Sequence, residues 1–282
     1  MQIEENRIEL NGIQINYAQA GTGKAIIFLH NGGGFWQTWY YQIKHFSENY
    51  SVYAIDWPGF GESELPEKSI TLQLLTKTLE EFIKKLDLNH VILVGNCIGA
   101  SVALQYNIEY PEKVDKLILM NICPGKLLIK NKLVRKLIQA SNTKPILKKI
   151  LGSILVFSFT KTPIKLQFPK ILFGNNYSTS YLSNKYTAIF KTVKQTQARV
   201  DLLFSIYTYT LKQIISNKTI PSNILLWGKD NKVASKEDFG YYHKELLCPE
   251  VYEEIEDSGH LCMYENPINV NELINRYIEA DT

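Results

Sequence analysis

The chain has 282 residues, of which 45% are hydrophobic and 21% are charged, and its formal net charge at pH 7 is +3. This composition indicates a soluble globular protein, large enough for one domain or for a core with an insertion. The sequence has no uninterrupted run of about 18 apolar residues, which argues against a transmembrane helix, and its acidic start argues against a signal peptide.

The first part of the chain, up to Asn121, alternates strand-like runs with helical runs. Strands that alternate with helices are joined by right-handed crossovers, so we expect a mostly parallel sheet. The predicted strands are Ile13–Tyr17, Ala25–Leu29, Ser51–Asp56, Val91–Gly95 and Lys116–Met120, and the predicted helices are Trp36–Phe46, Ser69–Leu86 and one that begins near Ala100.

The alternation is interrupted by a long helical segment. From residue 122 to residue 217 the pattern is helical, and strands resume at Asn223–Trp227 and Val251–Ile255, followed by a helix at Val270–Ile278. We therefore predict an α/β core made of residues 1–121 and 218–282, with residues 122–217 forming an inserted helical cap.

The cap is also the basic part of the chain. From Lys116 to Arg199 there are 16 Lys or Arg and no Asp or Glu, whereas the other residues hold 15 Lys or Arg and 28 Asp or Glu. A charge division this sharp indicates two structural units with different surroundings.

Residues 95–99 (GNCIG) follow a predicted strand and precede a predicted helix. Glycines at both ends allow a sharp turn without a Cβ clash. The pattern is the G-x-S-x-G nucleophile elbow with Cys97 in place of serine, which would present a thiol next to a helix N-terminus.

Three further motifs accompany the elbow in order along the chain. They are His30–Gly34 (HNGGG), Asp56–Ser63 (DWPGFGES) and Asp257–His260 (DSGH), the last followed by Glu265–Pro267. Together with the elbow they resemble the α/β-hydrolase superfamily, in its one-domain form with a helical cap inserted after the sixth strand. The resemblance implies a mostly parallel eight-stranded sheet with helices on both faces.

This resemblance implies that Cys97 is the nucleophile and His260 the general base. A helix N-terminus and a histidine partner would lower the pKa of the thiol. Two other interpretations of Cys97 are open: a buried, inert cysteine, or a serine replaced in the laboratory to trap a complex.

The resemblance implies an acid after the strand that ends near Trp227. The usual spacing puts it at Asn231, with Asp230 one residue earlier. Either side chain could orient the imidazole, since asparagine does so in Cys-His-Asn sites. We favour Asp230.

An oxyanion hole needs two backbone N–H groups that point to one position. By resemblance these come from Ile98 and from Gly32, with Gly33 as the alternative because Asn31 departs from the usual glycine. We also expect Asn31, Phe35 and Trp36 to contact the substrate.

A thiol nucleophile favours thioester chemistry, because acyl transfer from a thioester to Cys97 is nearly isoenergetic. We therefore expect a thioesterase or acyltransferase that forms an acyl-Cys97 intermediate with an apolar acyl group. The alternatives are an ordinary carboxylic-ester hydrolase or lipase-like enzyme, and a non-catalytic ligand-binding homologue. Epoxide hydrolase or dehalogenase activity is not expected, because related enzymes of those kinds use Asp at position 97.

The basic cap indicates an anionic partner. An acidic acyl carrier protein or a coenzyme A thioester would be attracted to it, and so would an anionic membrane surface; alternatively its lysines are simply solvated. No nucleic-acid recognition motif accompanies the charge. The four cysteines (Cys97, Cys123, Cys248 and Cys262) lack metal-site spacing and are expected to be free thiols of a cytoplasmic protein without metal or cofactor.

Overall fold

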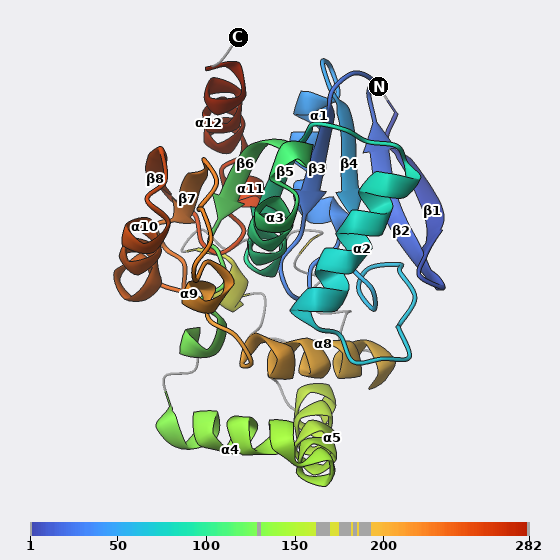
Figure 1. The fold of residues 1–282 in the computed structure, drawn as a ribbon, viewed down its shortest axis with the longest axis vertical. Helices are drawn as coiled ribbons and strands as arrows, with labels where there is room; N and C mark the ends of the chain where they lie inside the picture. Colours follow the sequence, from blue (N-terminus) through green and yellow to red (C-terminus); the bar gives the residue numbers. More distant parts are fainter. Residues whose placement is uncertain are drawn as a thin grey trace.

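The computed structural model describes residues 2–128, 131–161, 170–174, 182, 185 and 193–280. Its centre is an eight-stranded sheet with the order β1-β2-β4-β3-β5-β6-β7-β8 (Figure 1). The strands are β1 Glu4–Leu10, β2 Ile13–Ala20, β3 Ala25–Leu29, β4 Ser51–Ile55, β5 Val91–Asn96, β6 Val114–Met120, β7 Ile224–Gly228 and β8 Val251–Ile255. The pairs β1–β2 and β2–β4 are antiparallel and the remaining pairs are parallel, which confirms the predicted sheet.

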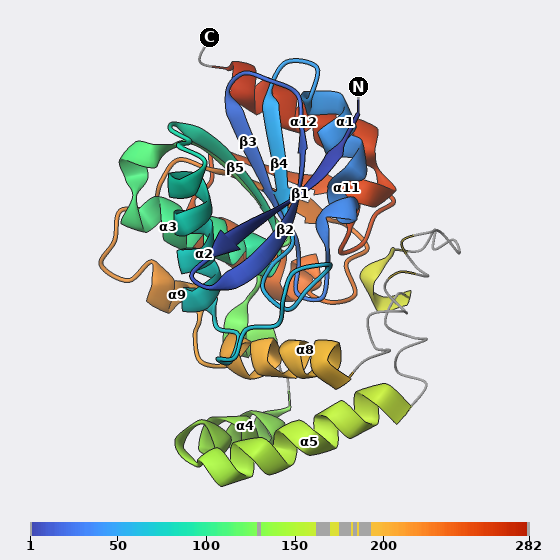
Figure 2. The ribbon, with the colours of Figure 1, turned by 90° about the vertical axis from the view of Figure 1, so that its right-hand side faces the viewer.

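Two apolar layers cover the sheet, because successive strand residues point to opposite faces. Ile27 and Leu29 pack in one layer and Ile26 and Phe28 in the other. Helices α2 (Leu72–Lys85) and α3 (Ile98–Glu109) contribute to the first layer. The 3-10 turn η1 (Trp36–Trp39) and helices α1 (Tyr40–Phe46), α11 (Cys262–Glu265) and α12 (Pro267–Glu279) contribute to the second (Figure 2).

Strand β1 was not predicted from the sequence. Its residues (EENRIEL) are mostly polar, and most of them are exposed or half-buried. An edge strand with one neighbour needs few apolar residues, and charged side chains on it prevent pairing with other chains. The apolar pattern used for the inner strands therefore does not detect it.

All described elements between β6 and β7 are helical. They are η3 (Gly125–Leu128), α4 (Lys132–Thr143), α5 (Pro145–Lys161), α8 (Val193–Ile206) and α9 (Leu211–Ile214). Helix α8 lies against the core, and α4 and α5 form an outer layer beyond it (Figures 1 and 2). Ile138, Val156, Val200 and Phe204 form a small apolar cluster that joins α4, α5 and α8.

The chain after β7 continues through the π-helical turn η4 (Lys236–Gly240) and helix α10 (Tyr241–Leu247) to β8. No helix among the described residues is both long enough and apolar enough to cross a bilayer.

Candidate active site

Cys97 lies at a sharp turn between β5 and α3. Its φ of 55° and ψ of −112° are rare for a residue with a side chain, and such strain concentrates at functional sites. The turn depends on its glycines: a Cβ at Gly95 would lie 2.5 Å from the backbone N of Ala100, and a Cβ at Gly99 would overlap the backbone oxygen of Leu29. The sequence therefore folds residues 95–99 as the predicted elbow.

The Cys97 sulfur is almost buried, with 9% of the residue exposed. The backbone N–H groups of Ile98 and Gly32 both act on it, and each favours the thiolate and so lowers the pKa of Cys97. The neighbouring Cys123 thiol and then burial outweigh them, and together they raise the pKa of Cys97 well above its usual value. The predicted lowering of this pKa is therefore wrong, because burial and a second thiol act against the helix N-terminus.

Cys123 is a site residue that the sequence analysis missed. It follows β6, the strand next to β5, and its backbone N–H donates to the Cys97 carbonyl oxygen at 3.2 Å. The neighbouring Cys97 thiol, the Gly125 N–H and the Tyr209 hydroxyl lower the pKa of Cys123 despite its burial. No sequence motif contains Cys123. Only the pairing of β5 with β6 would have indicated that it lies next to Cys97.

His260 is buried beside the same cavity as Cys97. Its backbone N–H donates to the Leu172 carbonyl at 2.8 Å, and its carbonyl accepts from Asn96 Nδ2 at 3.0 Å and from Asn121 Nδ2 at 3.3 Å. Burial lowers the pKa of His260 to about 4, so the imidazole is neutral at pH 7. A neutral imidazole is the form that can accept a proton.

The expected orienting hydrogen bond to His260 is not formed. Among the described residues, the buried Nδ1 of His260 has no hydrogen-bond partner. The Asn231 side chain is used elsewhere: its Oδ1 accepts from the N–H groups of Val233 and Ala234 at 3.0 and 3.1 Å, and its Nδ2 donates to Asn121. Asp230 contacts the His260 loop through its backbone, donating to the Ser258 carbonyl at 2.9 Å. The predicted role of Asp230 or Asn231 is therefore not supported by a contact.

Asn121, another residue missed by sequence analysis, connects the ends of several strands. Its Oδ1 accepts from the Gly228 N–H at 2.9 Å and from Asn231 Nδ2 at 3.0 Å. Its Nδ2 donates to Asn96 Oδ1 and to the His260 carbonyl, both at 3.3 Å. These bonds fix the position of the histidine backbone relative to β5, β6 and β7.

The cavity that contains Cys97 and His260 has a volume of about 230 Å³. No Asp or Glu is among its described lining residues, and most of the lining is apolar: Cys123, Leu128, Ile171, Leu172, Leu202, Leu203, Ile206 and Val233. Besides His260, its polar lining comes from Arg199, Asn31, Gly32 and Gly33. An apolar cavity with few polar groups is typical of a ligand site.

Two predicted substrate contacts, Phe35 and Trp36, do not line this cavity. Phe35 is fully buried and Trp36 nearly so, and both belong to the apolar layer beneath α1. The chain turns away at Gly34, and the Trp36 N–H donates to Asp56 Oδ1 at 2.6 Å. Asn31 does line the cavity, as do both candidate oxyanion glycines, Gly32 and Gly33.

The loop that carries Gly32 is held by buried polar groups. His30 Nε2 accepts from the Trp57 N–H at 3.0 Å, so its Nδ1–H donates to the Asn31 carbonyl at 2.7 Å. Burial lowers the pKa of His30 to about 3, which keeps this ring neutral. Asp56 accepts from Asn16 and from the Trp36 and Glu62 N–H groups. These bonds fix the loop that brings the Gly32 N–H to the sulfur.

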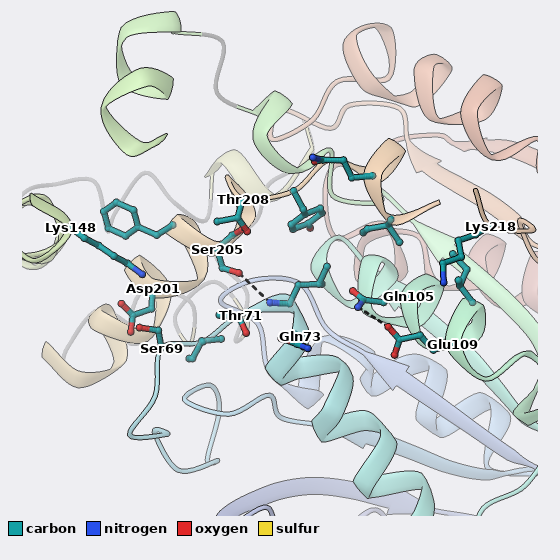
Figure 3. Close-up of a pocket in the computed structure, with 17 residues that line it drawn as sticks. Ser69, Thr71, Gln73, Gln105, Glu109, Lys148, Asp201, Ser205, Thr208 and Lys218 are labelled. Atoms are coloured by element: carbon teal, nitrogen blue, oxygen red, sulfur yellow. Dashed lines mark hydrogen bonds between the residues drawn. The ribbon is translucent and has the colours of Figure 1, made fainter. Parts of the chain in front are cut away.

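A second, larger cleft of about 550 Å³ lies between α2, α3 and α8 (Figure 3). It contains neither Cys97 nor His260. Several of its polar groups bond to one another: the Leu72 N–H donates to Ser205 Oγ at 3.2 Å, and Gln105 donates to Glu109 at 3.0 Å. The smaller cavity is therefore the candidate active site.

A family model described as alpha/beta hydrolase fold matches residues 24–267. Epoxide hydrolase 1 of Caenorhabditis elegans is 34% identical over 119 residues, which are 41% of this chain and 30% of that protein. The match thus spans about a third of that relative's length. A 2-hydroxy-6-oxo-6-(2'-aminophenyl)hexa-2,4-dienoic acid hydrolase of Metapseudomonas resinovorans is 25% identical over 268 residues, covering 93% of this chain and 87% of that protein.

The solved structure of a membrane phospholipase A has a TM-score of 0.77 and 20% identity, covering 99% of this chain and 86% of the other. At this identity the likeness shows the fold alone. The matched relatives are named as hydrolases, which supports an enzymatic role.

Proposed function

Because this chain belongs to the α/β-hydrolase family, we propose that it is a carboxylic-ester hydrolase that forms a covalent acyl-Cys97 intermediate. One observation carries the proposal: a thiol on an elbow, a neutral imidazole and two backbone N–H donors meet at one apolar cavity. These are the parts that acyl transfer requires: a nucleophile, a base and an oxyanion hole.

In the first step the Cys97 sulfur attacks the carbonyl carbon of the ester, and His260 accepts the thiol proton. The carbonyl oxygen becomes an oxyanion, which would accept hydrogen bonds from the Ile98 and Gly32 N–H groups that act on the sulfur in the free protein. Each such donor contributes about 3 kcal/mol to transition-state stabilisation. The C–O bond then breaks, His260 returns its proton to the leaving alkoxide, and an acyl-Cys97 thioester remains.

In the second step a water molecule attacks the thioester, and His260 removes its proton. The tetrahedral intermediate collapses, the C–S bond breaks, and the proton returns from His260 to the Cys97 sulfur as the carboxylic acid leaves. Burial lowers the pKa of His260 to about 4, and the Cys123 thiol together with burial raises that of Cys97, so both groups are neutral before each cycle. Proton transfer is therefore expected to accompany attack rather than precede it.

The cavity favours a short apolar acyl group. Its volume of about 230 Å³ corresponds to roughly eight molecules of liquid water. Leu128, Leu202 and Ile206 line it and would contact the acyl chain. Since the lining contains little that could hold a strongly polar acyl group, we expect activity to fall as polarity is added to the chain.

Epoxide hydrolysis is not proposed, although epoxide hydrolases are among the matched relatives. A thiol that opens an epoxide forms a carbon–sulfur thioether, which water does not hydrolyse. A carboxylate at position 97 would form a hydrolysable ester instead. With Cys97 the enzyme would be alkylated after one turnover.

A second candidate function is acyl transfer from thioesters, and the sulfur of Cys97 favours it. Exchange of one thioester for another is nearly isoenergetic, and the acyl-Cys97 intermediate remains reactive toward acceptors other than water. The mostly apolar lining of the cavity would disfavour the attacking water and allow an amine or alcohol to compete with it.

The test compares three substrates that carry similar small apolar groups: p-nitrophenyl butyrate, butyryl-coenzyme A and styrene oxide. We expect ester turnover and an acyl adduct on the Cys97 peptide by mass spectrometry. Thioester turnover above ester turnover would favour the second candidate. Sustained epoxide turnover would contradict both.

Two variants complete the test. Cys97→Ala should abolish both turnover and the adduct, whereas Cys248→Ser, which changes an exposed cysteine, should change neither. Ester turnover that survives in Cys97→Ala would refute the covalent mechanism.

A further inference from the structure

The outer helices α4 and α5 carry an unusual number of exposed hydrophobic side chains. Of the fifteen exposed large hydrophobic residues among those described, seven lie on these two helices, with exposed fractions from 40% to 77%. They are Leu133, Val134, Leu137, Ile146, Ile150, Ile154 and Phe157. A concentration of this kind on a soluble fold marks an interaction surface.

On α5 the exposed residues form a regular stripe. Ile146, Ile150, Ile154 and Phe157 fall within about 80° of one another on the helix, which advances 100° per residue. The opposite side of α5 is the one that packs on α8: a Cβ at Gly152 would lie 3.8 Å from the Val200 and Phe204 side chains. The stripe therefore points away from the rest of the protein.

The charge on these two helices has one sign. Residues 132–157 contain six basic residues and no Asp or Glu: Lys132, Arg135, Lys136, Lys144, Lys148 and Lys149. Lys149, next to the exposed Ile150, is itself exposed. Apolar side chains flanked by cations on outer helices are the features of a helix that lies in a membrane interface.

We propose that the outer face of α4 and α5 binds the surface of an anionic phospholipid bilayer. The exposed isoleucines and Phe157 would enter the region between headgroups and acyl chains, and the exposed lysines Lys132, Lys136 and Lys149 would contact lipid phosphates. The face would lie on the membrane without crossing it, which agrees with the absence of a spanning helix among the described residues.

Charge and shape favour a membrane over the other occupants. A second copy docked through the same face would bring exposed lysines, among them Lys132, Lys136 and Lys149, close to charges of the same sign, which opposes association. An acidic carrier protein would match the charge but not a stripe of four large apolar side chains. A bilayer supplies both anionic headgroups and an apolar interior.

The proposal does not depend on the reaction, but it places the cavity close to lipid. Helix α8 lies between the outer layer and the core (Figure 2). Val200 and Phe204 on one side of α8 join the cluster with α4 and α5, whereas Leu202 and Ile206 line the cavity. One helix therefore separates the proposed membrane face from the candidate active site.

The test measures sedimentation of the protein with vesicles of phosphatidylcholine alone or mixed with phosphatidylserine. We expect binding to the mixed vesicles only, and weaker binding at high salt, since surface charges are screened. Phe157→Trp should give a blue shift of its fluorescence on binding. Ile150→Ser and Ile154→Ser should each weaken binding about tenfold, and Lys149→Gln about fivefold.

Matched controls lie elsewhere on the surface. Ile268→Ser changes an isoleucine that is 73% exposed on α12, and Lys77→Gln changes an exposed lysine on α2; neither should alter binding. Absence of binding to mixed vesicles would refute the proposal, as would binding that Ile150→Ser leaves unchanged. A dimer in light scattering that Ile150→Ser dissolves, without vesicle binding, would instead identify a second copy as the occupant.

Discussion

His243 offers the sharpest test of how burial controls the pH response of this protein. It lies on α10 with no exposed surface, and its ring is 5.8 Å from that of Trp227. Neither ring nitrogen has a hydrogen-bond partner among the described residues. Burial lowers the pKa of His243 from 6.5 to about 4.

The size of the effect follows from proton linkage. The unfolded chain binds a proton at His243 below about pH 6.5, but the folded protein does so only near pH 4, so acidification between these values favours unfolding. The contribution of His243 to stability is thus complete above pH 6.5 and declines as the pH falls. At pH 5 the unfolding free energy is about 2 kcal/mol lower than at neutral pH because of His243 alone. This is a large share of a typical unfolding free energy.

We therefore expect His243→Leu to reduce acid sensitivity. Urea unfolding of wild type and variant at pH 8, 7 and 5 measures this. Between pH 8 and 7 the free energy of unfolding should change by the same amount in the two proteins. Between pH 7 and 5 the variant should lose about 2 kcal/mol less of its unfolding free energy than the wild type. At pH 7 the variant should be at least as stable, because it removes two unpaired polar atoms. Equal losses in the two proteins between pH 7 and 5 would refute a buried neutral His243.

Four further substitutions test the site. Gly99→Ala should lower the unfolding free energy by about 3 kcal/mol in urea titration, since its Cβ would overlap the Leu29 oxygen; an unchanged midpoint would contradict this. Cys123→Ala should move alkylation of Cys97 by iodoacetamide to lower pH, because the Cys123 thiol is the main cause of the raised Cys97 pKa. Asp230→Asn should change kcat/KM less than about fivefold, because at most one neutral hydrogen bond of about 1 kcal/mol is at stake. Asn231→Asp should cost about 3 kcal/mol in urea titration, because a buried donor to Asn121 is lost.

The sequence predicted the inner strands and the elbow well because local constraints determine both. Ala25–Leu29 is apolar throughout since both of its faces are buried, and the glycines around Cys97 are required by contacts within a few residues. The position of Asp230 and the burial of Phe35 depend instead on how distant segments pack. No spacing rule reports that Asn231 is already bonded to Asn121.

The electrostatics of the site were harder to predict than its geometry. A helix N-terminus next to Cys97 is visible in the sequence, but the opposing effects of burial and of Cys123 are not. The exposure of Ile146, Ile150 and Ile154 could not be predicted from the sequence either. An apolar helical stripe has the same sequence pattern whether it packs on a core or faces solvent. The sequence thus identifies the reacting groups, while their protonation states require the fold.

The tight packing of Gly99 determines which parts of this protein can adapt to different ligands. Because Gly99 lies against the backbone of Leu29 and His30, helix α3 and the strand that leads to the Gly32 loop cannot shift independently. The sulfur and its two N–H donors therefore form a rigid unit. Variation in acyl shape must be accommodated on the opposite wall, at Leu202 and Ile206 of α8. Substrate range could then diverge through that helix while the reacting atoms keep their arrangement.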